Sequence, residues 1–159
     1  MTDRRTFLRS LGAVALGSAL PARSAGAMSA VSARRMDRPG IQLYTLRSAM
    51  AGDFEGTLAR VAEIGYREVE FAGYFERTPE QVRATLDRVG LVAPATHVSF
   101  GELRDRLEMT LASARSIGHR YVIVPSLPGN MRTATGYAEV ARELNRAGER
   151  AARIGITIG

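Results

Sequence analysis

The feature that most constrains this fold is a junction that occurs four times along the chain. Each time, apolar residues at helical spacing end in a β-branched residue and a glycine, and a new apolar run begins soon after. The four junctions are Ile64-Gly65, Val89-Gly90, Ile117-Gly118 and Ile154-Gly155. A glycine just past a helix adopts the left-handed conformation without the steric cost of a Cβ atom. The pattern therefore predicts helices that alternate with parallel strands.

The predicted strands cover residues 41–46, 68–73, 91–97 and 121–124, with a fifth beginning at Ile156. Strand-plus-helix units recur every 23 to 30 residues, and eight such units fill the roughly 250 residues of a TIM (β/α)₈ barrel. A doubly wound sheet is the competitor, but its first turn should be rich in glycine, and residues 47–52 contain one glycine. We therefore predict an α/β fold, the amino-terminal half of a TIM barrel over residues 41–159, truncated after about four units.

Helix boundaries are marked by side chains that can satisfy free backbone groups. Asp53 can cap a helix that begins at Phe54, and Thr78 with Gln81 forms a capping box around Pro79. Two further helices are predicted by apolar residues three or four positions apart, and we expect both stripes to be buried. These stripes are Leu103, Leu107, Leu111, Ala114 and Ile117, and then Tyr137, Val140, Leu144, Ala147, Ala151 and Ile154.

Residues 1–27 have the composition of an export signal. A basic start with Arg4 and Arg5 precedes an apolar run at 11–20 and a small-residue end at Ala27. The run is shorter than the roughly 20 residues that a membrane-spanning helix needs, so no stable membrane anchor is expected. The start resembles the twin-arginine export motif, which implies the twin-arginine machinery as a partner and a periplasmic location. Residues 28–40 lack periodicity and are interpreted as a flexible linker.

Composition excludes several function classes. Cysteine and lysine are both absent, which removes disulfides, Schiff-base lysines and the P-loop lysine. The net charge is +6, but four arginines outweigh Asp3 by three charges within the export signal alone. The remaining charges alternate in sign along the predicted helices, as at Arg104, Asp105, Arg106 and Glu108. This pattern is typical of a solvated surface, so no nucleic-acid partner is expected.

Four stretches in the same order resemble the xylose-isomerase-like barrels, also called sugar phosphate isomerases/epimerases, a family that includes apurinic-site endonucleases. They are residues 40–47, 64–71, 96–99 and 117–124. The resemblance implies a divalent metal, manganese, magnesium, zinc or cobalt, held by Glu, Asp, His and Glu from strands five to eight. It also implies proton transfer next to a carbonyl by two of these carboxylates. None of these ligands lies in this chain, so no catalytic or metal-binding residue is assigned to it.

Residues at the carboxyl ends of the predicted strands are the candidates for substrate binding, because barrel enzymes place their sites there. Glu70 and His97 lie near the carboxyl ends of predicted strands two and three. Gln42 and Tyr44 are two residues apart on strand one and are therefore expected on the same face. Glu70 has a structural alternative, an ion pair with Arg47. The structural alternative for His97 is a hydrogen bond to a neighbouring loop. The resemblance also implies that the endonuclease branch has a metal-binding histidine at this position. His119 is expected at the opposite end of the barrel and is assigned no role.

The leading functional hypothesis is an exported, metal-dependent isomerase or epimerase that acts on a sugar, keto sugar or polyol. The chain as given is expected to be inactive without strands five to eight. A noncatalytic periplasmic sugar-binding barrel, or a hydrolase or lyase on the same scaffold, remains an alternative. The residues after strand four, 124–128 (VPSLP), lack the histidine expected of the endonucleases. Open strand edges also predict a possible homo-oligomer.

Overall fold

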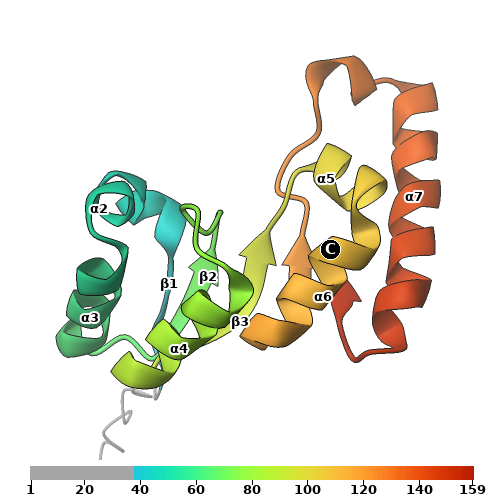
Figure 1. Cartoon of the computed structure of the whole chain (residues 1–159). Helices are drawn as coiled ribbons and strands as arrows, with labels where there is room; N and C mark the ends of the chain where they lie inside the picture. Colours follow the sequence, from blue (N-terminus) through green and yellow to red (C-terminus); the bar gives the residue numbers. More distant parts are fainter. Residues whose placement is uncertain (1–37) are drawn as a thin grey trace, which may run out of the picture. The chain divides into compact units, whose positions relative to one another are not determined.

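The strand order identifies the fold. A computed structural model describes residues 38–159, and Figure 1 shows its strands and helices alternating along the chain. All strand pairs of the sheet are parallel and lie in sequence order: β1 (Gly40–Gln42), β2 (Glu68–Phe71), β3 (Val92–His97), β4 (Tyr121–Ile123) and β5 (Thr157–Ile158). In a doubly wound sheet the order of the parallel strands reverses near the middle of the sheet. Sequential order is that of a barrel wall, which confirms the predicted TIM-barrel architecture.

Helices and two short 3₁₀ segments connect the strands. The 3₁₀ segments are η1 (Leu43–Leu46) and η2 (Gly129–Met131). The helices are α2 (Arg47–Gly52), α3 (Phe54–Ile64), α4 (Pro79–Val89), α5 (Phe100–Asp105), α6 (Leu107–Ile117) and α7 (Ala134–Ala152). The predicted export signal at 1–27 lies outside the described residues, as does most of the predicted linker at 28–40. No helix within residues 38–159 is long and apolar enough to cross a membrane.

Three of the four predicted glycine junctions are helix C-caps. Gly65, Gly90 and Gly118 end α3, α4 and α6 with φ of 116°, 71° and 97°. At the fourth junction α7 ends earlier, at Ala152, and a turn carries the chain to Gly155, whose φ is 75°. These left-handed angles are the reason that each helix stops and the chain turns back into the sheet.

The predicted N-terminal caps are also present. Asp53 accepts a hydrogen bond from the Gly56 N–H at 2.9 Å and begins α3. Thr78 Oγ1 accepts from the Gln81 N–H at 3.3 Å, while Gln81 Oε1 accepts from the Thr78 N–H at 2.9 Å. This reciprocal capping box satisfies backbone donors that the first turn of α4 leaves without intrahelical partners.

The helices cover one face of the sheet. On β2, Val69 and Phe71 are buried in an apolar cluster with Phe54, Leu58 and residues of α4. A second apolar cluster joins β4 and β5 to α5, α6 and α7. Side chains alternate along a strand, so Glu68 and Glu70 point to the other face, which the helices leave uncovered. In a closed barrel this second face is the interior.

Strand one is shorter than predicted. It ends at Gln42 instead of residue 46, and the chain enters η1, where Leu43 is buried. The Gln42 side chain accepts a hydrogen bond from the Tyr44 N–H and so caps this 3₁₀ turn. Tyr44 therefore does not share a strand face with Gln42, and the period-two argument for that pair was wrong.

The predicted helix through Leu103 and Ile117 is two helices. α5 ends at Asp105 and α6 begins at Leu107, because Arg106 leaves the helical conformation with φ of −133° and ψ of 31°. The apolar stripe on α7 was also only partly correct, since Tyr137 is 54% exposed and Ile154 36% exposed. Three members of the predicted stripe, Val140, Ala147 and Ala151, are buried as expected.

Candidate functional site

A large hollow in the described part of the chain opens where the strands end. This cleft, of about 570 Å³, is lined by residues that follow the carboxyl ends of β2, β3 and β4. They are Ala72 and Gly73, then Val98 to Glu102, and then Pro125 to Pro128, together with Tyr44 and His97. The cleft therefore lies at the end of the sheet where barrel enzymes bind their substrates. We refer to it as the carboxyl-end cleft.

Three of the four predicted site residues contact one another across β1, β2 and β3, through one hydrogen bond and one ion-pair contact. His97 Nε2 lies 2.8 Å from Glu70 Oε1, and His97 Nδ1 lies 3.2 Å from the Gln42 amide nitrogen. The side chains of His97 and Glu70 are 24% and 28% exposed, so both reach solvent at one edge. The parallel register places Gln42 of β1 beside Glu70 on one side of β2 and pairs β3, which carries His97, on the other side of β2. These residues are far apart in the sequence, and the pairing of the strands brings them together.

The cluster joins two hollows. His97 and Tyr44 line the carboxyl-end cleft, while Gln42 and Glu70 line a smaller hollow of about 260 Å³ on the uncovered face of the sheet. That smaller hollow also contacts Glu68, Pro94 and Ala95. The contacts of His97 with Gln42 and Glu70 connect the lining of the carboxyl-end cleft to that of the smaller hollow. A ligand that enters from the cleft would therefore meet the imidazole before the carboxylate.

Tyr44 is held at the edge of the cleft by Arg47. The tyrosine is 57% exposed, and the Arg47 guanidinium lies 4.5 Å from its ring centre and donates to the Tyr44 carbonyl oxygen at 3.0 Å. This contact occupies the arginine that was the alternative partner of Glu70. Glu70 pairs with His97 instead, so the predicted Glu70–Arg47 ion pair does not form.

Sequence reasoning missed three polar residues of the cleft. Ser99 and Glu102 follow β3, and Ser126 follows β4. Ser99 Oγ also accepts from the Glu102 N–H at 3.1 Å and caps α5. Their positions just after predicted strand ends were the signal that could have found them. No arginine is among the residues that line this cleft, so its charged groups are the Glu102 carboxylate and, when protonated, His97.

His119, which was assigned no role, has a structural one within the described residues. It is 4% exposed, its Nδ1 lies 2.6 Å from the Ala93 carbonyl oxygen, and its Nε2 lies 3.0 Å from the Tyr74 hydroxyl. Burial lowers the pKa of His119 and raises the pKa of Tyr74. The Tyr74 hydroxyl also lies 3.1 Å from Thr96 Oγ1. These side chains lie between the sheet and α4 and stabilise the neutral imidazole.

The described residues do not fit a divalent metal. Over residues 38–159, no three histidine, aspartate or glutamate side chains converge as a metal site requires. Glu70 and His97 are a pair without a third such ligand in this part of the chain. The chemistry that these residues can perform by themselves is hydrogen bonding to polar groups of a ligand.

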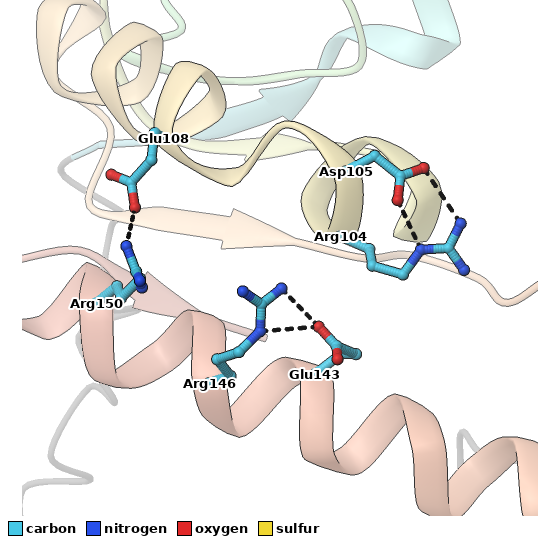
Figure 2. Close-up of polar contacts among 6 residues, drawn as sticks. All are labelled: Arg104, Asp105, Glu108, Glu143, Arg146 and Arg150. Atoms are coloured by element: carbon cyan, nitrogen blue, oxygen red, sulfur yellow. Dashed lines mark hydrogen bonds and ion pairs between the residues drawn. The ribbon is translucent and has the colours of Figure 1, made fainter.

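Charges on the helices around α7 are paired with one another, as Figure 2 shows. Arg104 contacts Asp105 at 2.8 Å, Arg146 contacts Glu143 at 2.7 Å, and Arg150 of α7 pairs with Glu108 of α6. Exposed pairs of this kind contribute little stability, but they neutralise the arginines locally. This surface is therefore a solvated face with mixed charge, as the alternating sequence pattern predicted.

Comparison with known proteins bears on the fold. No protein-family model matches the chain, and no curated protein matches it. Among solved structures, a sugar phosphate isomerase/epimerase from Parabacteroides distasonis matches with a TM-score of 0.62 and 24% identity, over 80% of this chain and 52% of that one. An AP endonuclease, family 2, from Brucella melitensis matches with a TM-score of 0.63 and 18% identity, over 77% and 54%.

The chain thus spans about half the length of both solved structures. At these identities the likeness shows the fold alone. Both neighbours are xylose-isomerase-like TIM barrels. The parallel sheet in sequential order and the match to about half of each neighbour lead to one conclusion, that residues 38–159 have the fold of a truncated TIM barrel.

Proposed function

We propose that the carboxyl-end cleft binds a neutral sugar, keto sugar or polyol, as part of a barrel of the isomerase/epimerase kind. The observation that carries this proposal is the cluster beside the cleft in which His97 contacts both Gln42 and Glu70. Within the described residues, the Glu70 carboxylate has one oxygen bonded to His97 and a second with no hydrogen-bond partner. A free carboxylate oxygen accepts a hydrogen bond from a hydroxyl group, which is the group that sugars and polyols offer in number.

The charge of the cleft supports a ligand without phosphate. Phosphate recognition usually relies on arginine, lysine or a run of backbone N–H groups at a helix N-terminus. The cleft has no arginine in its lining, and Glu102 adds a negative charge to it. The N-terminus of the short helix α5 also lines the cleft, but Ser99 Oγ already accepts from its Glu102 N–H. The exposed ring of Tyr44 adds an apolar surface against which the carbon face of a sugar could pack.

The finer activity, metal-dependent proton transfer next to a carbonyl, is proposed only for a chain that also has strands five to eight with their ligands. The metal, whether manganese, magnesium, zinc or cobalt, would activate the carbonyl there. The alternatives are a binding barrel without catalysis, and a hydrolase or lyase. Solvent deuterium incorporation next to the carbonyl of a bound keto sugar, in the presence of Mn²⁺, would favour isomerisation; binding without incorporation would favour the binding barrel.

The binding proposal is tested by calorimetric titration of the full chain with fructose, xylose and myo-inositol, and with fructose 6-phosphate. Glu70→Gln removes the charged acceptor, and a lost hydrogen bond to a charged group costs about 1.5 to 3 kcal/mol, roughly tenfold to over a hundredfold in affinity. Glu63→Gln is the control, because Glu63 lies on α3 and lines neither hollow. Equal loss in both variants, or tighter binding of the phosphate, would overturn the proposal.

We also propose that the chain is exported through the twin-arginine route and processed after Ala27. Support comes from the residues of segment 1–27 alone. Replacement of Arg4 and Arg5 together by lysine should abolish export, as followed by fractionation of cells and mass spectrometry of the amino terminus. Continued export of the double variant would indicate the general secretory route.

A further inference from the structure

We propose that Gln42 is a positioning residue that fixes His97 in the neutral tautomer with its proton on Nε2. That proton is then on the nitrogen that contacts Glu70 Oε1, and the second carboxylate oxygen of Glu70 remains available to a ligand. The statement about the ligand rests on the proposed function, while the statement about the tautomer does not.

The direction of the Gln42 amide follows from the backbone. The Tyr44 N–H lies 2.8 Å from Gln42 Oε1, and a backbone N–H can only donate. The atom that faces Tyr44 is therefore the amide oxygen, so the amide NH₂ group is the end that faces His97 Nδ1 at 3.2 Å. Although the two ends of a glutamine are hard to tell apart by shape, this contact settles which is which.

The tautomer follows from the amide. An NH₂ group donates and cannot accept, so His97 Nδ1 must present its lone pair and carry no proton. The proton of the neutral ring is then on Nε2, which lies 2.8 Å from Glu70 Oε1, an acceptor. The Nδ1 of His97 is thus satisfied by Gln42, its Nε2 contacts Glu70 Oε1, and the second Glu70 oxygen has hydrogen-bonding capacity left.

The early end of β1 is what builds this arrangement. Gln42 has extended φ and ψ of −86° and 120° and is the N-cap of η1, whose first turn brings the Tyr44 N–H back over the Gln42 side chain. Had β1 continued to residue 46, the Tyr44 N–H would lie along the strand instead. The 3₁₀ turn therefore orients the amide, and the amide orients the imidazole proton.

His119 provides an internal reference of the opposite kind. Its Nδ1 lies 2.6 Å from the Ala93 carbonyl oxygen, which can only accept, so its proton is on Nδ1. The chain contains two histidines. We therefore expect one histidine of each tautomer in the same molecule, which makes the assignment readable in a single spectrum.

The test is ¹⁵N–¹H correlation spectroscopy of the imidazole rings of the full chain at about pH 8, above the ordinary histidine pKa of about 6.5. If the chain associates, magic-angle spinning of the sedimented protein reads the same nitrogen shifts. The expected result is an unprotonated Nδ1 in one histidine and an unprotonated Nε2 in the other, with His97→Asn removing the former pattern. A proton on Nδ1 of both rings overturns the proposal.

Gln42→Glu tests the cause. It keeps the shape and the acceptor for the Tyr44 N–H, but it replaces the donor that faces His97 with a second acceptor, so the Nδ1 signal of His97 should move to the protonated range. Gln81→Glu is the matched control, because a glutamate preserves that capping box and should leave both rings unchanged. Unchanged His119 signals show that each variant is folded. An unchanged His97 signal in Gln42→Glu overturns the proposal.

The two proposals can fail separately. A chain with the expected tautomers that binds no polyol would overturn the proposed function and leave the role of Gln42 standing. A chain that binds polyols through Glu70 but has the other His97 tautomer would overturn the role of Gln42 and leave the proposed function standing.

Discussion

At the residue scale, the two histidines differ in their exposure to solvent and in their hydrogen-bond partners. His97 is partly exposed between an amide donor and a carboxylate, whereas His119 is enclosed between the sheet and α4. Burial penalises the charged imidazolium, and for His119 this is the largest cause of its lowered pKa, with the nearby Arg83 charge acting in the same direction. The hydrogen bond to the Ala93 carbonyl opposes both without cancelling them.

The lowered pKa of His119 predicts a loss of stability in acid. The unfolded chain binds a proton as the pH falls through the ordinary value of 6.5, while the folded chain resists it. The contribution to the free energy of unfolding is therefore complete above pH 6.5 and decreases below it, down to the pKa of the folded state. Urea unfolding between roughly pH 7.5 and 5.5 should show this slope.

His119→Gln is the comparison for that slope. This variant should be less stable at every pH, because it loses the packing and hydrogen bonds of a buried ring. Its unfolding free energy should nevertheless depend less on pH than that of the wild type over the same interval. Parallel pH curves for the two proteins would show that His119 does not contribute to the acid response.

At the element scale, local caps and long-range packing share control of where helices and strands end. The start of α4 is set by its own residues, Thr78, Pro79 and Gln81. The break between α5 and α6 has no such cause, because neither proline nor glycine occurs between residues 102 and 117. It allows Leu103 on one side, and Leu107 and Leu111 on the other, to be buried in the same cluster.

The capping box of α4 predicts a measurable effect on stability. Thr78→Ala removes the acceptor for the Gln81 N–H and should reduce the free energy of unfolding by about 1 kcal/mol. Thr78→Ser retains the hydroxyl oxygen and should be close to wild type. Urea unfolding midpoints of the three proteins measure the difference. An alanine variant as stable as the serine variant would mean that solvent satisfies this helix end equally well.

At the scale of the whole molecule, the sheet has two open edges within the described residues. β1 and β5 each pair with a neighbour on one side only. The uncovered face also carries apolar groups, because Val92 is 43% exposed and Ile123 is only partly buried. Open strand edges and uncovered apolar faces favour association with further strands, whether from the same kind of chain or another.

The chain by itself is therefore predicted to self-associate. Analytical ultracentrifugation of the full 159-residue chain should show dimers or larger species instead of a monomer. Thr157 and Gly159 donate their N–H groups to β4, so by alternation the Ile158 N–H faces the open edge.

Ile158→Pro tests the role of that edge. The substitution removes a donor from the open edge without removing a hydrogen bond to β4, and it should shift the distribution toward monomer. Ile158→Ala is the control for loss of the side chain alone and should still associate. A wild-type chain that sediments as a single monomer and unfolds cooperatively would contradict the prediction of association.

Much of the fold could be predicted from sequence because its causes are local. Gly65, Gly90 and Gly118 stop helices through their own φ angles, and Asp53 and Thr78 start them through hydrogen bonds that span three residues. The repeat of these signals fixed the alternation of helix and strand, and hence the barrel architecture. The positions of Glu70 and His97 near strand ends followed from the same pattern.

Tertiary structure decided the features whose causes lie far apart in the chain. The end of β1 at Gln42 depends on burying Leu43, and the break at Arg106 depends on packing against α7 and β4. The choice of His97 over Arg47 as the partner of Glu70 required β2 and β3 to pair in a particular register. The sequence by itself determined the elements, since caps and glycines act within a few residues. Only the folded sheet determined the site, because hydrogen bonds between strands depend on which residues the register places side by side.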